Sequence, residues 1–298
     1  MTLRKTTISL MVISLLIFQG GCRKTPEPPA PGNSIDFSNC ITAGTGSSLE
    51  ILTINLHGFP KDGYQSVVAV SKLISQADAD IVAIQEVATE AGFNQLLDEL
   101  DGWDGRFYPE LNDVYNLAFV FKTSEISIDD SKTKLILTND SYAFPRAPFE
   151  VYLKHRSLNI GTYLINVHLK CCGGSDNEAR RQDAALKLDS YINANHKNDP
   201  VIVLGDYNDE ISGTSASTNV FYNFIANPSD YRFADMAIAK GSQLWWSYPS
   251  YPSHIDHMLV TNELFGKIDT TVVLKPDPCY AEYFTEVSDH RPVKLVLR

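Results

Sequence analysis

The stretch VIVLGDYN, residues 201–208, decides the fold class of this chain. Its first four residues are apolar and mostly β-branched, which is typical of a strand buried on both faces in an α/β protein. The strand then runs into Asp206 and Asn208, which do not suit a packed core because both side chains need polar partners. Strand ends on one edge of a sheet lie close together, and α/β proteins build their sites there. The stretch therefore predicts a central strand with functional side chains at its end.

Five further apolar runs end in polar side chains in the same way. Taken singly, an Asp or Asn after a strand is usually a turn former or a helix N-cap. Six such runs in one chain indicate instead that their polar side chains gather at one site. The five runs are TINLHG at 53–58, DIVAIQEV at 80–87, LINVHL at 164–169, SHIDHML at 253–259 and VSDHRPV at 287–293.

The order of elements predicts two packed sheets with helices on their outer faces. Strand–helix alternation opens and closes the chain, and the middle is rich in strands. No linker-like composition interrupts the chain after residue 48, so we expect one domain. The expected helices are 64–75, 90–100 and 176–193, and the expected strands are 49–56, 80–85, 117–121, 151–154, 163–169, 200–204, 254–260 and 292–297.

The residue types at these strand ends favour a hard metal ion. Three or more carboxylates together with amides form an all-oxygen shell, which suits Mg²⁺, Mn²⁺ or Ca²⁺ and does not suit Zn²⁺. A hard cation beside histidines is suited to the hydrolysis of phosphate esters. We therefore expect a hydrolase that uses Mg²⁺, with Mn²⁺ or Ca²⁺ as alternatives.

These motifs resemble the endonuclease/exonuclease/phosphatase superfamily, which includes pancreatic-type deoxyribonucleases, bacterial sphingomyelinases and inositol polyphosphate 5-phosphatases. The resemblance covers residues 48–298, and its most specific parts are GDYN at 205–208, IDH at 255–257 and SDHRPV at 288–293. The resemblance implies an α/β fold, a four-layer α/β/β/α sandwich of two packed mixed sheets.

The resemblance also implies a metal site. Glu86 matches the main metal ligand of the family, and Asn55 and Asp289 match positions at or near the metal. His57 stands where abasic-site enzymes of the family carry a second acid, which weakens an interpretation with two metals.

The remaining matches are expected to act on the phosphate and the attacking water. Asp206 would position and activate the water, and Asn208 would hold the water or the phosphate. His290 would hydrogen-bond the scissile phosphate, oriented by Asp256, since a carboxylate fixes the tautomer of an imidazole and raises its pKa. His168 resembles the phosphate-contacting histidine of the deoxyribonuclease and sphingomyelinase-like members. The expected catalytic residues are therefore Asp206, Asn208, His290, His168 and Asp256. Of these, Asn208, His168 and His290 are also expected to bind the phosphate.

Two further features leave alternatives open. The aromatic run at 245–248 is either core packing or a wall of the substrate site. Arg181, in the helix expected after His168, either pairs with a buried acid or contacts phosphate, and we prefer the pairing. The segment 248–256 is short, so a substrate-clamping insertion is not expected there.

Cys40, Cys171, Cys172 and Cys279 allow three disulfide pairings, and the sequence does not choose among them. A Cys40–Cys279 bridge would pin the start of the domain. The adjacent Cys171 and Cys172 leave three alternatives: a strained vicinal bridge, two reduced thiols, or pairing with other cysteines. They have no zinc-binding spacing, and we expect them to be structural and to have no part in the chemistry.

The N-terminus predicts export. Residues 1–21 carry Arg4 and Lys5 before an apolar run at 8–18 that is too short to span a bilayer, as in a lipoprotein signal peptide. Cys22 would then carry the lipid, although an ordinary secretory signal is the alternative. We therefore expect a membrane-anchored lipoprotein in the periplasm or at the cell surface. Residues 22–47 hold several prolines and no apolar periodicity, so we expect a disordered tether before a domain at 48–298.

The charge restricts the substrate. The 298-residue chain has a formal net charge of −11, which disfavours strong non-specific binding to nucleic acid. We expect a monomer that acts on a small or lipid-borne phosphate ester. The alternatives are an extracellular nuclease and a non-catalytic surface-binding protein on the same fold.

Overall fold

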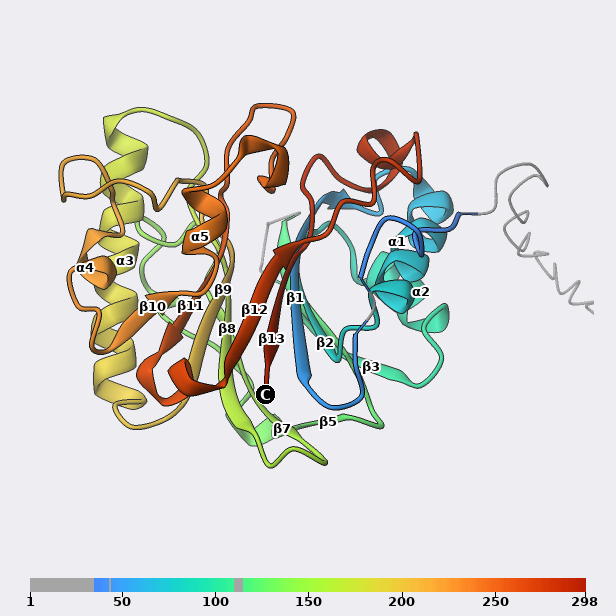
Figure 1. Cartoon of the computed structure of the whole chain (residues 1–298), viewed down its shortest axis with the longest axis horizontal. Coiled ribbons are helices and arrows are strands. Elements are labelled where there is room, and N and C mark those ends of the chain that lie inside the picture. The colour runs from blue at the N-terminus through green and yellow to red at the C-terminus, as the bar shows by residue number, and fades with distance from the viewer. Residues whose placement is uncertain (1–34, 43, 110–114) are drawn as a thin grey trace, which may run out of the picture. The chain divides into compact units, whose positions relative to one another are not determined.

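The computed structural model describes residues 35–42, 44–109 and 115–298. They form four layers (Figure 1): two β-sheets face each other, helices α1 and α2 cover the outer face of one sheet, and α3 and α4 cover the outer face of the other. The expected α/β/β/α sandwich of two mixed sheets is therefore confirmed.

The first sheet has six strands, and β1 and β2 lie at its centre. These two strands are parallel, and β1 pairs with β13 in the antiparallel sense. In sheet order the strands are β12 (Ile268–Val273), β13 (Val293–Leu297), β1 (Leu49–Phe59), β2 (Ile81–Val87), β4 (Asn116–Lys122) and β3 (Trp103–Tyr108).

The second sheet has seven strands, and β8 and β9 form its parallel pair. In sheet order the strands are β10 (Tyr231–Phe233), β11 (Asp256–Thr261), β9 (Val201–Asp206), β8 (Gly161–His168), β7 (Phe149–His155) and β5 (Ile126–Ile128), with β6 (Lys134–Leu135) also paired to β7.

The helices follow the strands they cover. The longer ones are α1 (Gly63–Ala77), α2 (Glu90–Asp98) and α3 (Ser175–Asn195). Short ones are α4 (Tyr222–Ile225), α5 (Met236–Ala239), the 3₁₀ turns η1 (Asp130–Lys132), η2 (Gln243–Trp245) and η3 (Asn262–Lys267), and the π turn η4 (Tyr283–Val287). Within the described ranges, no helix is both long and apolar enough to cross a membrane.

Side-chain alternation along β1 explains how the layers hold together. Leu52, Ile54 and Leu56 pack on the helix side of their sheet, whereas Leu49 and Ile51 pack between the two sheets. This period of two is what a strand between two apolar layers requires. Because Thr53 and Asn55 continue the inward-facing set, the same alternation aims polar side chains at the opposite sheet near the strand end.

The predicted helices and strands all form, within a few residues of their expected bounds. The additional strands β3, β5, β6, β10 and β12 were not predicted. They are short or partly exposed and lie at or near sheet edges, so they lack the continuous apolar run that marks a buried strand.

The prediction that the domain begins at residue 48, after a disordered tether, is wrong for residues 35–42, which the structure describes. Phe37 is fully buried in the core beneath α1, and Ile41 belongs to the same cluster. Cys40 is joined to Cys279 by a disulfide, which selects one of the pairings left open by the sequence. Residues 35–42 thus pack on the domain through isolated apolar side chains, which give no periodic signal. The predicted signal peptide, Cys22 and residues 23–34 lie outside the described residues.

Replacing Phe37 tests this boundary. Phe37→Ala should lower the free energy of unfolding by about 3–5 kcal/mol, because it leaves a cavity in a packed core. Asn39→Ala, at an exposed position two residues away, is the control and should stay within about 0.5 kcal/mol of the parent. Denaturant unfolding measures both, and equal stabilities would contradict the assignment of this segment to the domain.

Candidate active site

The strand register brings the predicted site residues to one edge of both sheets. Asn55 of β1 lies beside Gln85 of β2, next to Glu86. On the facing sheet, Asp206 of β9 lies beside both His168 of β8 and Asp256 of β11. Asp289 and His290 precede β13, which runs antiparallel to β1, so they reach the same edge, opposite the end marked C in Figure 1.

Asn55 links the two sheets at this edge. Its Nδ2 donates to Oε1 of Glu86 at 3.1 Å and to Oδ2 of Asp206 at 3.0 Å. Its Oδ1 accepts from the backbone N–H of His57 at 2.9 Å. One amide group therefore holds two carboxylates from different sheets close together, which is unfavourable unless positive charge or hydrogen bonds offset their repulsion.

His290 and Asp256 form a buried pair beside Asp206. The Nδ1 of His290 lies 2.8 Å from Oδ2 of Asp256, and its Nε2 lies 3.9 Å from Oδ2 of Asp206. Burial alone would lower the pKa of His290, but the charges of Asp256 and Asp206 and the hydrogen bond to Asp256 raise it to about 10. His290 is therefore protonated at neutral pH, as expected from the sequence.

Burial raises the pKa of Asp206 to about 6, and the charge of His290 opposes that rise. Asp206 is therefore ionised at neutral pH but sits close to the point at which it takes up a proton. A carboxylate with this property can accept a proton from water at neutral pH.

His168 has the opposite charge state to His290. Burial lowers its pKa well below the usual value, and the charges of Arg146 and His290 lower it further. Its Nε2 lies 3.7 Å from Glu86 and 3.6 Å from Asp206, so these contacts join a neutral imidazole to the carboxylates and are not ion pairs. The site thus holds one charged and one neutral imidazole.

Three site residues have left-handed backbone conformations. The φ angles are +61° at Glu86, +56° at Asn208 and +49° at His57. Such angles are uncommon for residues other than glycine and cluster at functional sites. Glu86 lies within β2, where the pairing with β4 shifts register between Ile84 and Val87, and Asn208 lies two residues beyond β9; both side chains line the cavity.

Gly205 is required before Asp206. Its φ is +140°, and a Cβ there would lie 2.0 Å from the backbone oxygen of Val167. Asn208 is also fixed, because its backbone N–H donates to Oδ1 of Asp206 at 2.9 Å and its Nδ2 donates to the oxygen of Leu169 at 3.2 Å. The remaining amide oxygen of Asn208 is thus held in a defined direction.

A cavity of about 520 Å³ opens over these side chains. Its size matches sites for small ligands. Seven of the eight predicted site residues line it, and Asp256 lies behind His290. Other lining side chains include Cys171, Cys172, Glu178, Arg181, Asp209, Glu210, Tyr248 and Tyr251. Arg181 and Tyr248 belong to the two features for which the sequence left alternatives open.

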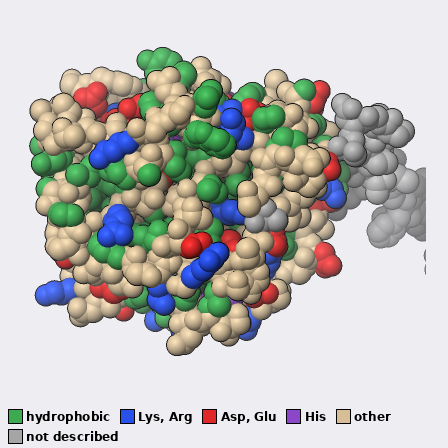
Figure 2. Space-filling model, viewed as in Figure 1, with side chains coloured by type: hydrophobic (Ala, Val, Ile, Leu, Met, Phe, Trp, Pro, Cys, Tyr) green, Lys and Arg blue, Asp and Glu red, His purple; other side chains and the backbone are tan. Residues whose placement is uncertain are grey.

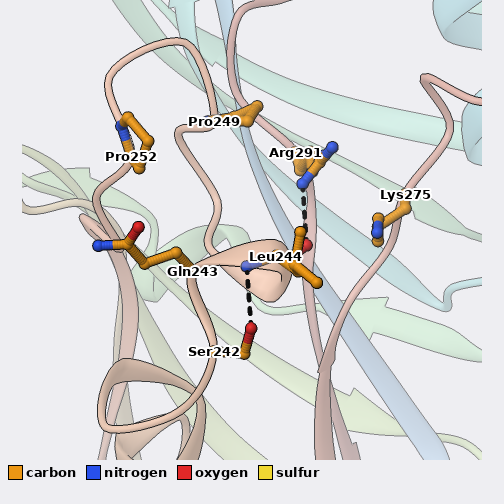
Figure 3. Close-up of a pocket in the computed structure, with 7 residues that line it drawn as sticks. All are labelled: Ser242, Gln243, Leu244, Pro249, Pro252, Lys275 and Arg291. Carbon is orange, nitrogen blue, oxygen red and sulfur yellow. Dashed lines mark hydrogen bonds between the residues drawn. The ribbon is translucent and has the colours of Figure 1, made fainter.

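A second cavity of about 470 Å³ lies beside the loop that carries Tyr248 (Figure 3). Its lining includes Leu244, Lys275 and Arg291. The aromatic run at 245–248 is not core packing: Trp245 is 53% exposed, and the ring of Tyr248 lies 4.8 Å from the ring of His290. The alternative of a substrate-site wall therefore fits this run.

Arg181 and Asp235 support the site from behind. Arg181 donates to Oδ2 of Asp209 through Nε at 2.9 Å and Nη2 at 2.7 Å, which confirms the preferred pairing with an acid. Asp235 is fully buried and accepts from His257 at 2.6 Å and His254 at 3.0 Å. Asp235 follows the strand β10, as the predicted site residues follow theirs, but β10 is too short to be recognised from the sequence.

The His257–Asp235 pair is charged. Burial opposes charge on both groups, but their mutual attraction raises the pKa of His257 and lowers that of Asp235. The Nε2 of His257 lies 2.9 Å from the backbone oxygen of Asp209, so the pair ties β11 to the loop that follows Asp206.

The carboxylates fit a hard divalent cation. Glu86 and Asp206 share the single amide of Asn55, and Asp289, whose Oδ1 lies 2.6 Å from Nδ1 of His57, lines the same cavity. Such an oxygen-rich set is what Mg²⁺ and its relatives prefer. Asp206, Asp256 and His290 also lie close enough to hold a metal, but His290 and Asp256 already satisfy each other.

A two-sheet α/β sandwich with these acids and histidines at its shared edge defines a class of enzymes that hydrolyse phosphate esters. The sequence model of the Endonuclease/Exonuclease/phosphatase family matches residues 52–290, and the chain belongs to that family. No curated protein matches the chain significantly in sequence.

Solved structures share the fold at low sequence identity. A humanised D. rerio TDP2 with 14 mutations aligns with a TM-score of 0.63 and 14% identity, over 85% of this chain and 99% of that one. The human Nocturnin catalytic domain with bound sulfate gives 0.61 and 17%, over 85% and 94%. A Bacteroides thetaiotaomicron mannosyl-6-phosphatase gives 0.61 and 16%, over 84% and 100%.

The pH dependence of kcat/KM tests the opposed charges of Asp206 and His290. Activity should rise with pH through about 6, as Asp206 loses its proton, and fall through about 10, as His290 loses its own. Asp256→Asn removes the charge that holds the proton on His290, so the fall in kcat/KM at high pH should begin at a lower pH. Asp269→Asn, which removes an exposed acid on β12, is the control. If the high-pH fall of kcat/KM stays at the same pH in Asp256→Asn, the pairing of His290 with Asp256 is refuted.

Proposed function

We propose that this protein is a divalent-metal-dependent phosphodiesterase or phosphatase, with Mg²⁺ as the metal, that acts on a small or lipid-borne phosphate ester outside the cytoplasm. The observation that carries the proposal is the arrangement of Asp206 and His290. A buried, ionised carboxylate faces a buried, protonated imidazole across 3.9 Å, at the edge of a cavity of about 520 Å³. A base for water and a cationic donor for phosphate are thereby held side by side.

Each side chain has a task in hydrolysis. Asp206 orients the attacking water and takes its proton, for which a pKa of about 6 is well matched. His290 donates one hydrogen bond, from Nε2, to the phosphate and offsets the charge that develops on it, while Asp256 fixes its orientation through Nδ1. Asn208 and the neutral His168 complete the contacts to phosphate and water.

Glu86, with Asn55 and Asp289, would hold the cation. Asn55 directs its Nδ2 toward the carboxylates, so an amide rotation would be needed to present its oxygen. The cation would polarise the phosphoryl oxygen and neutralise the acidic cluster when bound.

Charge and cavity size favour a small substrate over bulk nucleic acid. The chain is acidic overall, and on the face shown in Figure 2 the Lys and Arg side chains lie apart from one another. This face shows no continuous basic stripe of the kind that tracks a nucleic-acid backbone. The structural neighbour named as a mannosyl-6-phosphatase supports a sugar phosphate as one substrate class to test.

A nuclease is the second candidate. D. rerio TDP2, which shares this fold, has been solved with a single-strand DNA product. Tyr248 and the exposed Tyr251 line the site, where aromatic side chains can stack on bases. A protein that binds without turnover on the same fold is the third candidate.

Variants of the site residues test the proposed roles. Glu86→Ala, Asp206→Ala and His290→Ala should each lower kcat by ~10²-fold or more, because each removes metal binding, water activation or charge stabilisation. Activity should be measured with Mg²⁺ and with a chelator, on mannose 6-phosphate, inositol phosphates, sphingomyelin and plasmid DNA. Asp277→Asn, an acid that pairs with Arg291 outside the predicted set, serves as the control.

The substrate panel separates the candidates. Turnover of plasmid DNA alone would favour the nuclease. Binding without turnover of any substrate, unchanged in Asp206→Ala, would favour the non-catalytic protein. Wild-type rates in any of the three site variants would refute the role of that residue.

We also propose that the protein is exported and is anchored as a monomer through a lipid on Cys22, at the membrane surface of the periplasm or the cell. Cys22→Ala should move the protein from the membrane fraction to the soluble fraction, since lipidation of that cysteine is the proposed anchor. Cys171→Ala is the matched control because it removes a different thiol. Retention of Cys22→Ala in the membrane fraction would contradict lipid anchoring at this residue.

A further inference from the structure

The adjacent cysteines lie at the rim of the active-site cavity. Cys171 and Cys172 follow β8, three and four residues beyond His168, and precede α3. Both line the cavity that holds Asp206 and Asn208. Their sulfur atoms are 2.9 Å apart, and neither cysteine is in a disulfide. The pair therefore belongs to the site and is not an element of the core.

A buried arginine holds this loop in place. Nη1 of Arg181 donates to the backbone oxygens of Lys170 at 2.8 Å and Cys172 at 2.9 Å. The same guanidinium binds Asp209 in the loop after Asp206. The backbone on both sides of Cys171 is thus tied to the side of the cavity that carries the predicted base.

The backbone at Cys172 is held in an uncommon conformation. Its φ is +76°, in the left-handed region that residues with a Cβ rarely adopt. A conformation of this kind persists only where the surroundings impose it, and it is a reason to look for a function. Here it turns the Cys172 side chain toward Cys171, because the two sulfur atoms meet at 2.9 Å.

We propose that Cys171 and Cys172 form a vicinal disulfide that serves as a reversible wall of the active-site cavity. In this step the thiolate of one cysteine attacks a disulfide oxidant, such as oxidised glutathione, and releases one thiol from it. The second cysteine then attacks the mixed disulfide and releases the second thiol. Two cysteine thiols are oxidised, the S–S bond forms, and the oxidant's disulfide is reduced to two thiols.

The surroundings favour attack by Cys171. Burial would raise the pKa of its thiol, but the hydrogen bond from Cys172 and the nearby Lys170 outweigh that effect and lower it. A lower pKa increases the thiolate fraction, which is the reactive form.

The short Cα–Cα distance between neighbouring residues makes a Cys171–Cys172 disulfide easier to reduce than the Cys40–Cys279 disulfide. Adjacent Cα atoms lie ~3.8 Å apart across a trans peptide, whereas disulfides usually span about 4.4–6.8 Å. A bridge between neighbours is therefore strained and readily reduced. The Cα atoms of Cys40 and Cys279 are 6.0 Å apart, within the usual range, so a mild reductant should open the vicinal pair first.

Formation of the Cys171–Cys172 disulfide should affect the binding of substrate more than the chemical step. The cysteine side chains line the cavity, and their hydrogen bonds run to each other and from Lys170. A closed ring would fix both side chains, whereas separate thiols on the anchored backbone are free to rotate. A preorganised wall costs less ordering on binding. Reduction should therefore raise KM and leave kcat almost unchanged.

One tryptic peptide reports the state of the pair. Cleavage after Lys170 and Arg180 releases CCGGSDNEAR, residues 171–180, which contains both cysteines and no others. The purified protein is incubated with oxidised glutathione, denatured, alkylated without reduction and digested. We expect this peptide without alkyl groups and lacking two hydrogen atoms, whereas a dilute dithiol applied before alkylation should give two alkyl groups with Cys40–Cys279 still joined. Two free thiols, or two bound glutathiones, after oxidation would overturn the proposal.

Kinetics test the role of the wall. In wild-type protein first treated with oxidised glutathione, the dithiol should raise KM by about fivefold, the effect of one lost hydrogen bond or equivalent contact. The Cys171→Ala/Cys172→Ala variant keeps the Cys40–Cys279 bridge, so its KM should not respond to the dithiol. An equal response in both proteins, or none in the wild type, would overturn the wall role. The peptide measurement uses no substrate, so it stands apart from the success of the proposed hydrolysis.

Discussion

The buried carboxylate of Asp206 is the group on which the rest of the site depends. It ends a central strand of one sheet, and it is stabilised from three sides: by Asn55 of the other sheet at 3.0 Å, by the charge of His290, and by the backbone N–H of Asn208 at 2.9 Å. An ionised group without such partners would be too costly in a protein interior. The need to satisfy this carboxylate therefore sets the positions of the neighbouring loops.

The gap between the sheets carries a second polar link, formed by Gln85 and Asn166. Gln85 donates to Thr53 at 3.0 Å and to Asn166 at 2.8 Å, and Asn166 donates to backbone oxygens of Ile84 and Ala118. Apolar side chains fill the rest of the gap. Hydrogen bonds are directional, whereas apolar contacts are not, so these amides can hold the two sheets in one relative register. A site shared by two sheets requires such a register.

The two histidines show how burial and charge give the same side chain opposite properties. His290 lies 2.8 Å from Asp256 and keeps its proton, whereas the nearest carboxylates to His168, Asp206 and Glu86, lie 3.6 and 3.7 Å away and burial removes its proton. A site with one cationic and one neutral imidazole can offer a charged donor and a neutral contact to the same phosphate. The Arg181–Asp209 and His257–Asp235 pairs fix the loop behind them, and Arg181 connects that loop to the vicinal cysteines.

The sequence by itself determined the layer architecture and which strand ends meet at the candidate site. Buried strands such as 201–206 have continuous apolar runs, and their polar ends stand out against that background because polar groups in a core need partners. The sequence did not reveal that Phe37 is in the core, that Cys40 pairs with Cys279, or that Asp235, Asp209 and the vicinal cysteines surround the site. Some of those features are contacts between segments that are distant in the sequence. Others lie beside strands that are too short to show the alternation of apolar and polar residues by which a strand is predicted. Only the tertiary structure decided them, because burial and pairing across such distances depend on how the sheets pack.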